Sequence, residues 1–172
     1  MTLAGDLANS VFIPEKKVVS IQINIGDHKS PVVDFKPVPF KYQGATKWAR
    51  ARAKVIAANV KSADKYFKSL GKRSLTELLA DRTIWINYTE LPIRGMRDAR
   101  SYEIGIGHLA YVRGKEVVLG TLIHELAHIA GAPGGYSRAA EDALIHCGLG
   151  KQSEADHKID DPKTPYDPDV RG

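Results

Sequence analysis

Cysteine is almost missing from this chain of 172 residues, because Cys147 is the only one. A single cysteine excludes an internal disulfide framework and a cysteine-rich zinc site. The sequence also lacks any run of about 18 apolar residues, so we expect no membrane span. Residues 1–17 lack the basic start and apolar centre of a secretory signal. We therefore expect a protein that is cytoplasmic, or that is secreted without a signal peptide by a dedicated secretion system.

Acidic residues are scarce in one long segment of a chain whose net charge is +5. Between Lys41 and Arg73 there are ten Lys or Arg and one acidic residue, Asp64. No interleaved aromatic residues accompany these charges beyond those of an apolar helix stripe, so we interpret them as a solvated helix face and expect no nucleic-acid partner. The final segment, 151–172, holds six Asp or Glu and four Lys or Arg.

The composition, 43% apolar and 26% charged, is typical of a globular protein. Residues 1–150 show no repeat or linker, so we predict one α+β domain with a small mixed or antiparallel sheet. Residues 151–172 are polar, contain three prolines and lack periodicity, which predicts a flexible tail. The expected strands are 17–25, 31–35 (paired with 17–25), 83–88 and 103–112. The expected helices are 46–70, 74–80, 117–130 and 137–147, and a capping box at Ser74 and Glu77 opens the second of them. The first carries one apolar stripe at helical spacing, formed by Trp48, Ala51, Val55, Ala58, Ala63, Tyr66, Phe67 and Leu70.

The most informative pattern is H-E-x-x-H at 124–128. The apolar residues around it predict a helix, which Gly131 and Pro133 end. On a helix, positions i and i+4 share one face, so His124 and His128 can bind one metal ion. Glu125 would then lie beside the metal as a general base that takes a proton from water. This is the arrangement of zinc peptidases, and we predict a Zn²⁺ cofactor.

A catalytic zinc needs a third protein ligand, and the helix at 137–147 offers Glu141, Asp142 and His146. We favour Glu141, because it borders the apolar side of that helix and a carboxylate balances the charge of the ion. Asp142 and His146 remain alternatives. Cys147 is interpreted as a small buried residue.

The order strand, glycine-bearing strand, H-E-x-x-H helix, Gly-rich turn and Ala-Glu helix ending in Cys147-Gly148 resembles the zincin-like metallopeptidases. The resemblance covers roughly 103–150 and extends to small effector or toxin modules of bacteria, including those delivered by type VI secretion systems. Such an effector would have a cognate inhibitor or immunity protein. The chain departs from the metzincin pattern, because Gly134 stands where their third ligand falls and no Met-turn follows. The resemblance therefore implies the Glu-donating pattern, with Glu141 as ligand.

The resemblance also implies the hydrolysis of peptide bonds in a protein or peptide substrate. Zincins hold an extended substrate as an added strand, and we expect the segment 103–112 to lie beside the cleft, where Gly105 and Gly107 let a substrate backbone come close. The oxyanion needs a donor besides zinc. Tyr136 is the candidate nearest in sequence, and His108 and Tyr111 are the others.

Two other functions fit the motif. The first is a zinc amidase acting on a non-peptide or cell-wall bond. The second is a binding module stabilised by a structural zinc, in which Glu141 and His146 complete a closed set of four ligands. The presence of Glu125 argues against a structural zinc, since such a site has no use for a general base.

Overall fold

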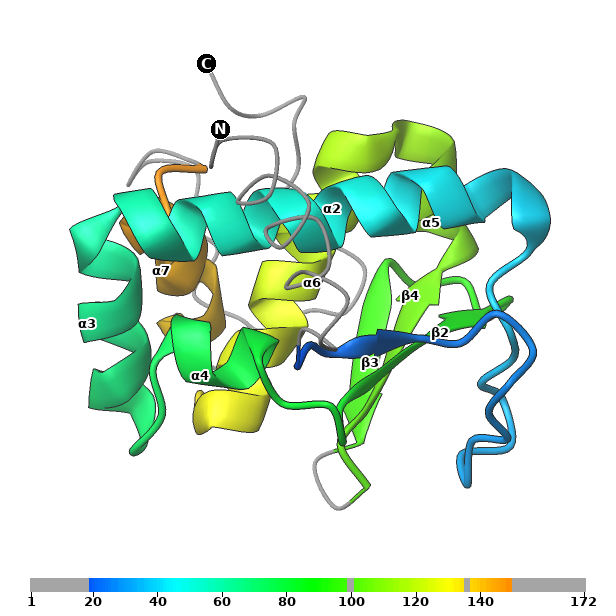
Figure 1. The fold of residues 1–172 in the computed structure, drawn as a ribbon, viewed down its shortest axis with the longest axis horizontal. Coiled ribbons are helices and arrows are strands. Elements are labelled where there is room, and N and C mark those ends of the chain that lie inside the picture. The colour runs from blue at the N-terminus through cyan, green and yellow to red at the C-terminus, as the bar shows by residue number, and fades with distance from the viewer. Residues whose placement is uncertain (1–18, 99–100, 135–136, 150–172) are drawn as a thin grey trace, which may run out of the picture.

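The computed structural model describes residues 19–98, 101–134 and 137–149, and within them the chain forms an α+β fold with a four-stranded mixed sheet and six helices (Figure 1). The predicted tail, 151–172, lies outside the described residues. The strands are β1 (Gln22–Ile23), β2 (Trp85–Thr89), β3 (Gly95–Asp98) and β4 (Glu103–Gly107). The helices are α2 (Phe40–Asn59), α3 (Lys61–Leu70), α4 (Leu75–Leu79), α5 (His108–Arg113), α6 (Lys115–Ala130) and α7 (Ala139–His146).

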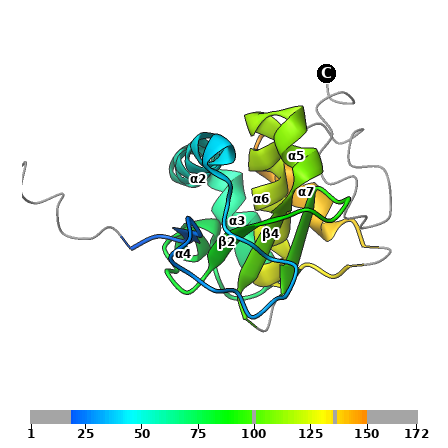
Figure 2. The ribbon, with the colours of Figure 1, turned by 90° about the vertical axis from the view of Figure 1, so that its right-hand side faces the viewer.

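The sheet separates the helices from one long loop. Its strand order is β1-β2-β4-β3, with β1 and β4 parallel to β2 and β3 antiparallel to β4. Apolar side chains of β2 and β4, among them Ile86 and Ile104, are fully buried. The loop 25–38 covers the opposite face, where His28 stacks on Trp85 with the ring centroids 4.0 Å apart. Figures 1 and 2 show α2 passing over the sheet, with α6 and α7 grouped beside it.

Two predictions about strands are wrong. The segment 31–35 does not pair with the first strand, and nearby only Lys36 forms an isolated bridge, to Tyr88. The strand predicted over 103–112 ends at Gly107, where α5 begins. β4 lies between β2 and β3, so neither of its edges is open to a substrate.

The two glycines of β4 make room for this chain rather than for a substrate. A Cβ at Gly105 would collide with the ring of Phe35, and a Cβ at Gly107 would collide with the carbonyl of Ile93. The prediction that these glycines let a substrate backbone approach is therefore wrong.

The helix predicted over 46–70 is two helices that meet at Val60. Val60 is extended, with φ −104° and ψ 98°, and the Asn59 side chain donates to the carbonyl of Val55, which competes with continuation of the helix. The buried positions of α2 and α3 therefore do not follow one continuous helical pattern. The buried face of α2 is Thr46, Ala49, Ala53 and Ile56, whereas Ala51, Val55 and Ala58 of the predicted stripe are exposed. On α3 the stripe is confirmed at Ala63 and Phe67, which are buried.

The predictions that depend on short-range sequence signals, such as caps and apolar runs, are confirmed. Ser74 and Glu77 form the capping box that opens α4, with Ser74 Oγ accepting from the Glu77 N–H at 3.0 Å. The predicted strand at 83–88 is β2, and the helices predicted at 117–130 and 137–147 are α6, which begins two residues earlier, and α7.

A buried polar network connects Asn24 and the following loop, 25–38, to the sheet. Asn87 donates its amide to Glu103 Oε1 at 3.0 Å and accepts from Asn24 at 2.8 Å. His28 Nε2 lies 3.0 Å from the same Glu103 oxygen, and Glu103 is only 2% exposed. A buried carboxylate is tolerated here because Asn87 and His28 lie within hydrogen-bond distance of it, and Asn24 in turn holds Asn87.

Replacing Asn87 with leucine should lower the free energy of unfolding by about 2–4 kcal/mol, because it leaves the Glu103 carboxylate and the Asn24 amide short of partners in the interior. Urea unfolding measures the change. The matched control is Asn59→Leu, an exposed asparagine whose loss should cost under about 1 kcal/mol. Equal losses in the two variants would mean that the network contributes nothing beyond packing.

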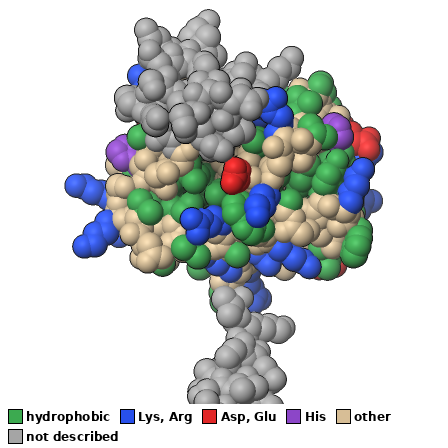
Figure 3. All heavy atoms as spheres, turned by 90° about the horizontal axis from the view of Figure 1, so that it is seen from above, with side chains coloured by type: hydrophobic (Ala, Val, Ile, Leu, Met, Phe, Trp, Pro, Cys, Tyr) green, Lys and Arg blue, Asp and Glu red, His purple; other side chains and the backbone are tan. Residues whose placement is uncertain are grey.

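No helix in the described part of the chain has both the length and the apolar composition to cross a bilayer. Figure 3 looks onto the face that carries α2, where Lys and Arg side chains are spread among apolar and polar atoms. On α2, Lys41, Lys47 and Arg52 are exposed, as expected of a solvated helix face.

Candidate metal centre

The H-E-x-x-H motif lies on α6, the most deeply buried helix of the fold. Every residue from Val117 to His128 is buried, because α6 packs against α2, α5, α7 and the strand β3. Two glycines bound it: Gly114 at the start, with φ 115°, and Gly131 at the end, with φ 131°. Both values lie where an L side chain is strained, so glycine is required at each end.

The turn after α6 fixes one of the two histidines. The Gly131 N–H donates to the carbonyls of Ala127 and His128, each at 3.1 Å, and the Ala132 N–H donates back to Ala127 at 2.9 Å. This turn brings the Ala132 carbonyl 2.9 Å from His128 Nδ1. A carbonyl oxygen can only accept, so Nδ1 carries a proton and Nε2 of the neutral ring presents a lone pair.

The two histidines face each other through their Nε2 atoms, which lie 3.1 Å apart. Two nitrogen ligands at about 2.0–2.1 Å from a tetrahedral zinc lie about 3.3 Å apart, close to this separation. A carboxylate oxygen lies 3.6 Å from His124 Nδ1, and in the tautomer that binds a metal through Nε2 the proton of His124 is on this Nδ1. Two Nε2 lone pairs would then meet at short range inside the protein, which is favourable when a cation lies between them. The donor set therefore fits a zinc ion.

That carboxylate belongs to Glu141, one of the three candidates for the third ligand. Glu141 Oε1 lies 3.6 Å from His124 Nδ1, and Glu141 is 4% exposed. The contact between α6 and α7 positions it, because Glu141 lies on the buried side of α7 with Ala140 and Leu144.

The other two candidates face elsewhere on α7. The ring of His146 stacks on Tyr66 of α3, with centroids 4.2 Å apart. Asp142 is half-buried, and its Oδ1 lies 3.5 Å from an Arg138 nitrogen. Burial, and secondarily the charge of Asp142, raises the pKa of Tyr66 to about 12. Of the three, Glu141 is the one whose contacts include a motif histidine.

Glu141 lies on the Nδ1 side of His124, whereas the histidines meet through Nε2. In agreement with this, no three His, Cys, Asp or Glu side chains of the described residues already surround one point as a metal-binding group. The arrangement holds two ligands in place, with a carboxylate next to one of them. The prediction that Glu141 is a ligand stays a prediction.

Glu125, the predicted base, is 3% exposed and lies beneath the edge strand β3. A Cβ at Gly95 would lie 2.8 Å from Glu125 Oε1 and would collide with the methyl group of Thr121. Gly95 thus lets the backbone of β3 run directly over the carboxylate. Sequence reasoning missed β3, because four residues without alternation give no strand signal.

The candidate oxyanion donors divide into two groups. Tyr111 and His108 belong to an aromatic cluster around Tyr42, which stacks on Tyr111 with centroids 4.4 Å apart. The Tyr111 hydroxyl lies 2.7 Å from Thr46 Oγ1, and burial raises the Tyr111 pKa above its usual range. Tyr136, the candidate nearest to the motif in sequence, lies outside the described residues.

Cys147 is buried at the end of α7, as predicted for a small core residue. Burial, with a further contribution from the charge of Asp64, raises the pKa of its thiol to about 12. The raised pKa favours the protonated thiol at neutral pH.

The chain matches no protein-family model, and neither the curated proteins nor the solved structures include one significantly similar to it. The assignment of a function to this site therefore depends on the motif and on the geometry described above.

Proposed function

We propose that this protein is a zinc-dependent peptidase of the zincin type. The observation that carries the proposal is the buried pair of Nε2 atoms, 3.1 Å apart, on a helix that also carries the buried Glu125. A metal ion between the two Nε2 atoms would be bound by both imidazoles at once, with the acidic Glu125 on the same helix.

His124 and His128 would hold the zinc ion, and Glu125 would act as general base. A zinc ion held there would supply Lewis acidity toward a carbonyl oxygen and a water molecule. Glu125 takes the proton of the attacking water on its carboxylate and passes it to the leaving amine.

Glu141 has two roles open to it, and both support the same centre. From its position 3.6 Å from Nδ1, a small approach would let it orient His124 by a hydrogen bond, as carboxylates commonly do for metal-binding histidines. To become the third ligand, the carboxylate must swing from the Nδ1 side of the ring to the Nε2 side. Tyr136 remains the proposed oxyanion donor.

The edge strand supports a peptide as the substrate. In the described residues β3 pairs with β4 alone and packs against α6, so its outer edge is the sheet edge nearest to Glu125. An extended peptide added there would pass beside the candidate metal centre. We therefore expect the substrate to lie along the outer edge of β3 and not along the segment 103–112. An open strand edge favours a peptide over a non-peptide amide as the substrate.

A closed structural site is less well supported. Such a site needs four protein ligands, and the second of its proposed extra ligands, His146, is stacked on Tyr66. The role of a secreted effector, with a cognate immunity protein, rests on the family resemblance and is part of the proposal on that basis.

A peptide-library cleavage assay with added zinc, repeated after chelation, tests the function. We expect cleavage that chelation abolishes and zinc restores. A cell-wall fragment with a non-peptide amide bond serves as the second substrate. Cleavage of that fragment alone would contradict the peptidase assignment and establish the amidase instead.

Replacing Glu141 with alanine should lower zinc affinity by at least about tenfold, the usual effect of removing a carboxylate that orients a ligand histidine. Calorimetric zinc titration measures it. Asp142→Ala is the matched control, since Asp142 is the neighbouring carboxylate on α7 and faces Arg138. Unchanged affinity in the Glu141 variant would remove this residue from the centre.

A further inference from the structure

The edge of the sheet farthest from β3 carries a second site. In the strand order β1-β2-β4-β3, β1 is the outer strand at that end and pairs with β2 alone among the described strands. Edge strands present backbone donors and acceptors to the outside, which another chain can use. Because β1 and β3 are separated by β2 and β4, this edge is separate from the candidate metal centre.

Backbone hydrogen bonds show which part of the β1 edge is open. The ladder to β2 uses the N–H groups of Gln22 and Asn24, which donate to Ile84 and Ile86 at 2.9 Å each. The N–H and C=O of Ile23 therefore point to the other side. At Ile21 that outer side is already occupied, because its N–H donates to Leu79 and its carbonyl accepts from Arg50 Nη1 at 2.9 Å.

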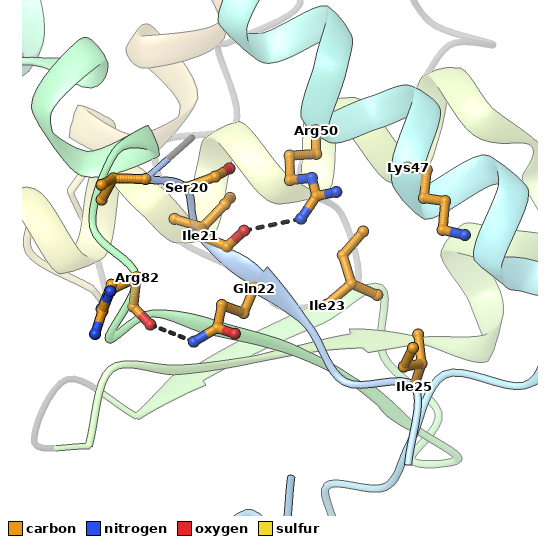
Figure 4. A pocket seen from close by; sticks show the side chains of 9 residues that line it. Ser20, Ile21, Gln22, Ile23, Ile25, Lys47, Arg50 and Arg82 are labelled. Atoms are coloured by element: carbon orange, nitrogen blue, oxygen red, sulfur yellow. Dashed lines mark hydrogen bonds between the residues drawn. The ribbon is translucent and has the colours of Figure 1, made fainter. Parts of the chain in front are cut away.

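A cavity of about 620 Å³ lies along this edge (Figure 4). Residues 19–23 and Ile25 line it together with the three cationic side chains of Lys47, Arg50 and Arg82. Figure 4 shows Lys47 and Arg50 reaching from α2 toward β1, with Arg82 on the opposite side. No lining residue is acidic, so the wall carries positive charge only.

No acidic side chain among the lining residues offsets the positive charge of the cavity wall formed by Lys47, Arg50 and Arg82. Burial lowers the pKa of the Arg50 guanidinium, and burial together with the charge of Arg50 lowers the pKa of Lys54, one turn further along α2. Both shifts mean that the charged forms are disfavoured where they lie. A carboxylate entering the cavity would offset this cost.

We propose that the β1 edge binds an extended acidic segment of a partner protein by strand addition. The partner backbone pairs with the N–H and C=O of Ile23, and its carboxylates lie against Lys47, Arg50 and Arg82. The exposed Val19 and Ile25, each 52% exposed, offer apolar contact at the two ends of the edge. A free anion would bind the cationic side chains but could not pair with both the N–H and the C=O of Ile23. These two backbone groups therefore favour a peptide as the ligand.

Binding of a fluorescein-labelled octapeptide of alternating Val and Glu to the full chain tests this proposal. Fluorescence anisotropy should show saturable binding, and the same peptide with Gln in place of Glu should bind at least about tenfold more weakly, because the charged contacts are lost. Mass spectrometry of the recovered peptide ensures that only intact peptide is scored. Equal binding of the two peptides, or no saturable binding of either, would overturn the proposal.

Variants of the cationic wall separate it from non-specific attraction. Lys47→Glu and Arg82→Glu change exposed side chains and should each weaken binding about threefold to tenfold. Lys65→Glu, an equal charge change on the exposed surface of α3, should leave binding nearly unchanged. The same loss in all three would show that only net charge matters, and the edge site would be excluded.

Amide hydrogen exchange tests the strand addition itself. On peptide binding, exchange at Ile23 should slow by at least about tenfold, while Gln22 and Asn24, already bonded to β2, should change little. No protection at Ile23 would mean simple anion binding. Slow exchange there before any peptide is added would mean that a segment of this chain already covers the edge. Either result would overturn the proposal.

Discussion

Replacing Glu125 with glutamine should lower peptide hydrolysis by about 10²–10⁴-fold while zinc content and fold stay unchanged. Glutamine keeps the shape of the side chain, so it fits beneath Gly95 as the carboxylate does. It cannot accept the proton of the attacking water, so only the acid–base step is removed. Steady-state kinetics on the peptide identified by the cleavage assay measure the effect, with zinc content determined on the same sample.

The matched control for this variant is Glu116→Gln, an identical change on the same helix at an exposed position. Its hydrolysis rate should stay within about twofold of wild type, as is usual for an exposed substitution. If the Glu125 variant retained full activity, the hydrolytic mechanism would be wrong, whether or not zinc binds.

Replacing His128 with alanine should abolish the stabilisation that zinc gives to the folded chain. A ligand that binds only the folded state at a hundred times its dissociation constant stabilises it by about 2.7 kcal/mol. In wild type, zinc should therefore raise the melting temperature. In His128→Ala it should not, because one of the two facing Nε2 atoms is gone. Thermal unfolding with zinc and after chelation measures both.

His146→Ala provides the control for metal binding by a histidine of the next helix. His146 stacks on Tyr66, so its loss affects packing and should leave the zinc-induced rise in melting temperature intact. Loss of that rise in the His146 variant alone would move the metal away from the H-E-x-x-H motif and toward α7. The comparison thus tests the ligand set without any assay of hydrolysis.

The parts of this protein that the sequence predicts are those set by local chemistry. The apolar run around His124 and the glycine at 131 specify α6 and its end, and the spacing of four residues places both imidazoles on one face. Ser74 and Glu77 specify the start of α4 in the same way. The preference for Glu141 used the apolar side of α7, and the structure places that carboxylate beside His124.

The parts that the sequence does not predict depend on contacts between distant segments. The break at Val60 interrupts a continuous helical pattern, and the direction of α3 follows from its packing against α7. β3 exists because it pairs with β4, although its four residues carry no strand pattern of their own. Glycines at 105 and 107 indicate that another group lies close to the backbone of β4. The sequence does not show that these groups are Phe35 and Ile93 and not a substrate.

The most direct test of the central claim is anomalous diffraction at the zinc edge from crystals of the full chain grown with zinc. We predict one strong peak within about 2.0–2.1 Å of both Nε2 atoms, those of His124 and His128. The peak should disappear from crystals of His128→Ala. A peak at another place, or no peak between these two nitrogens at saturating zinc, would contradict the account.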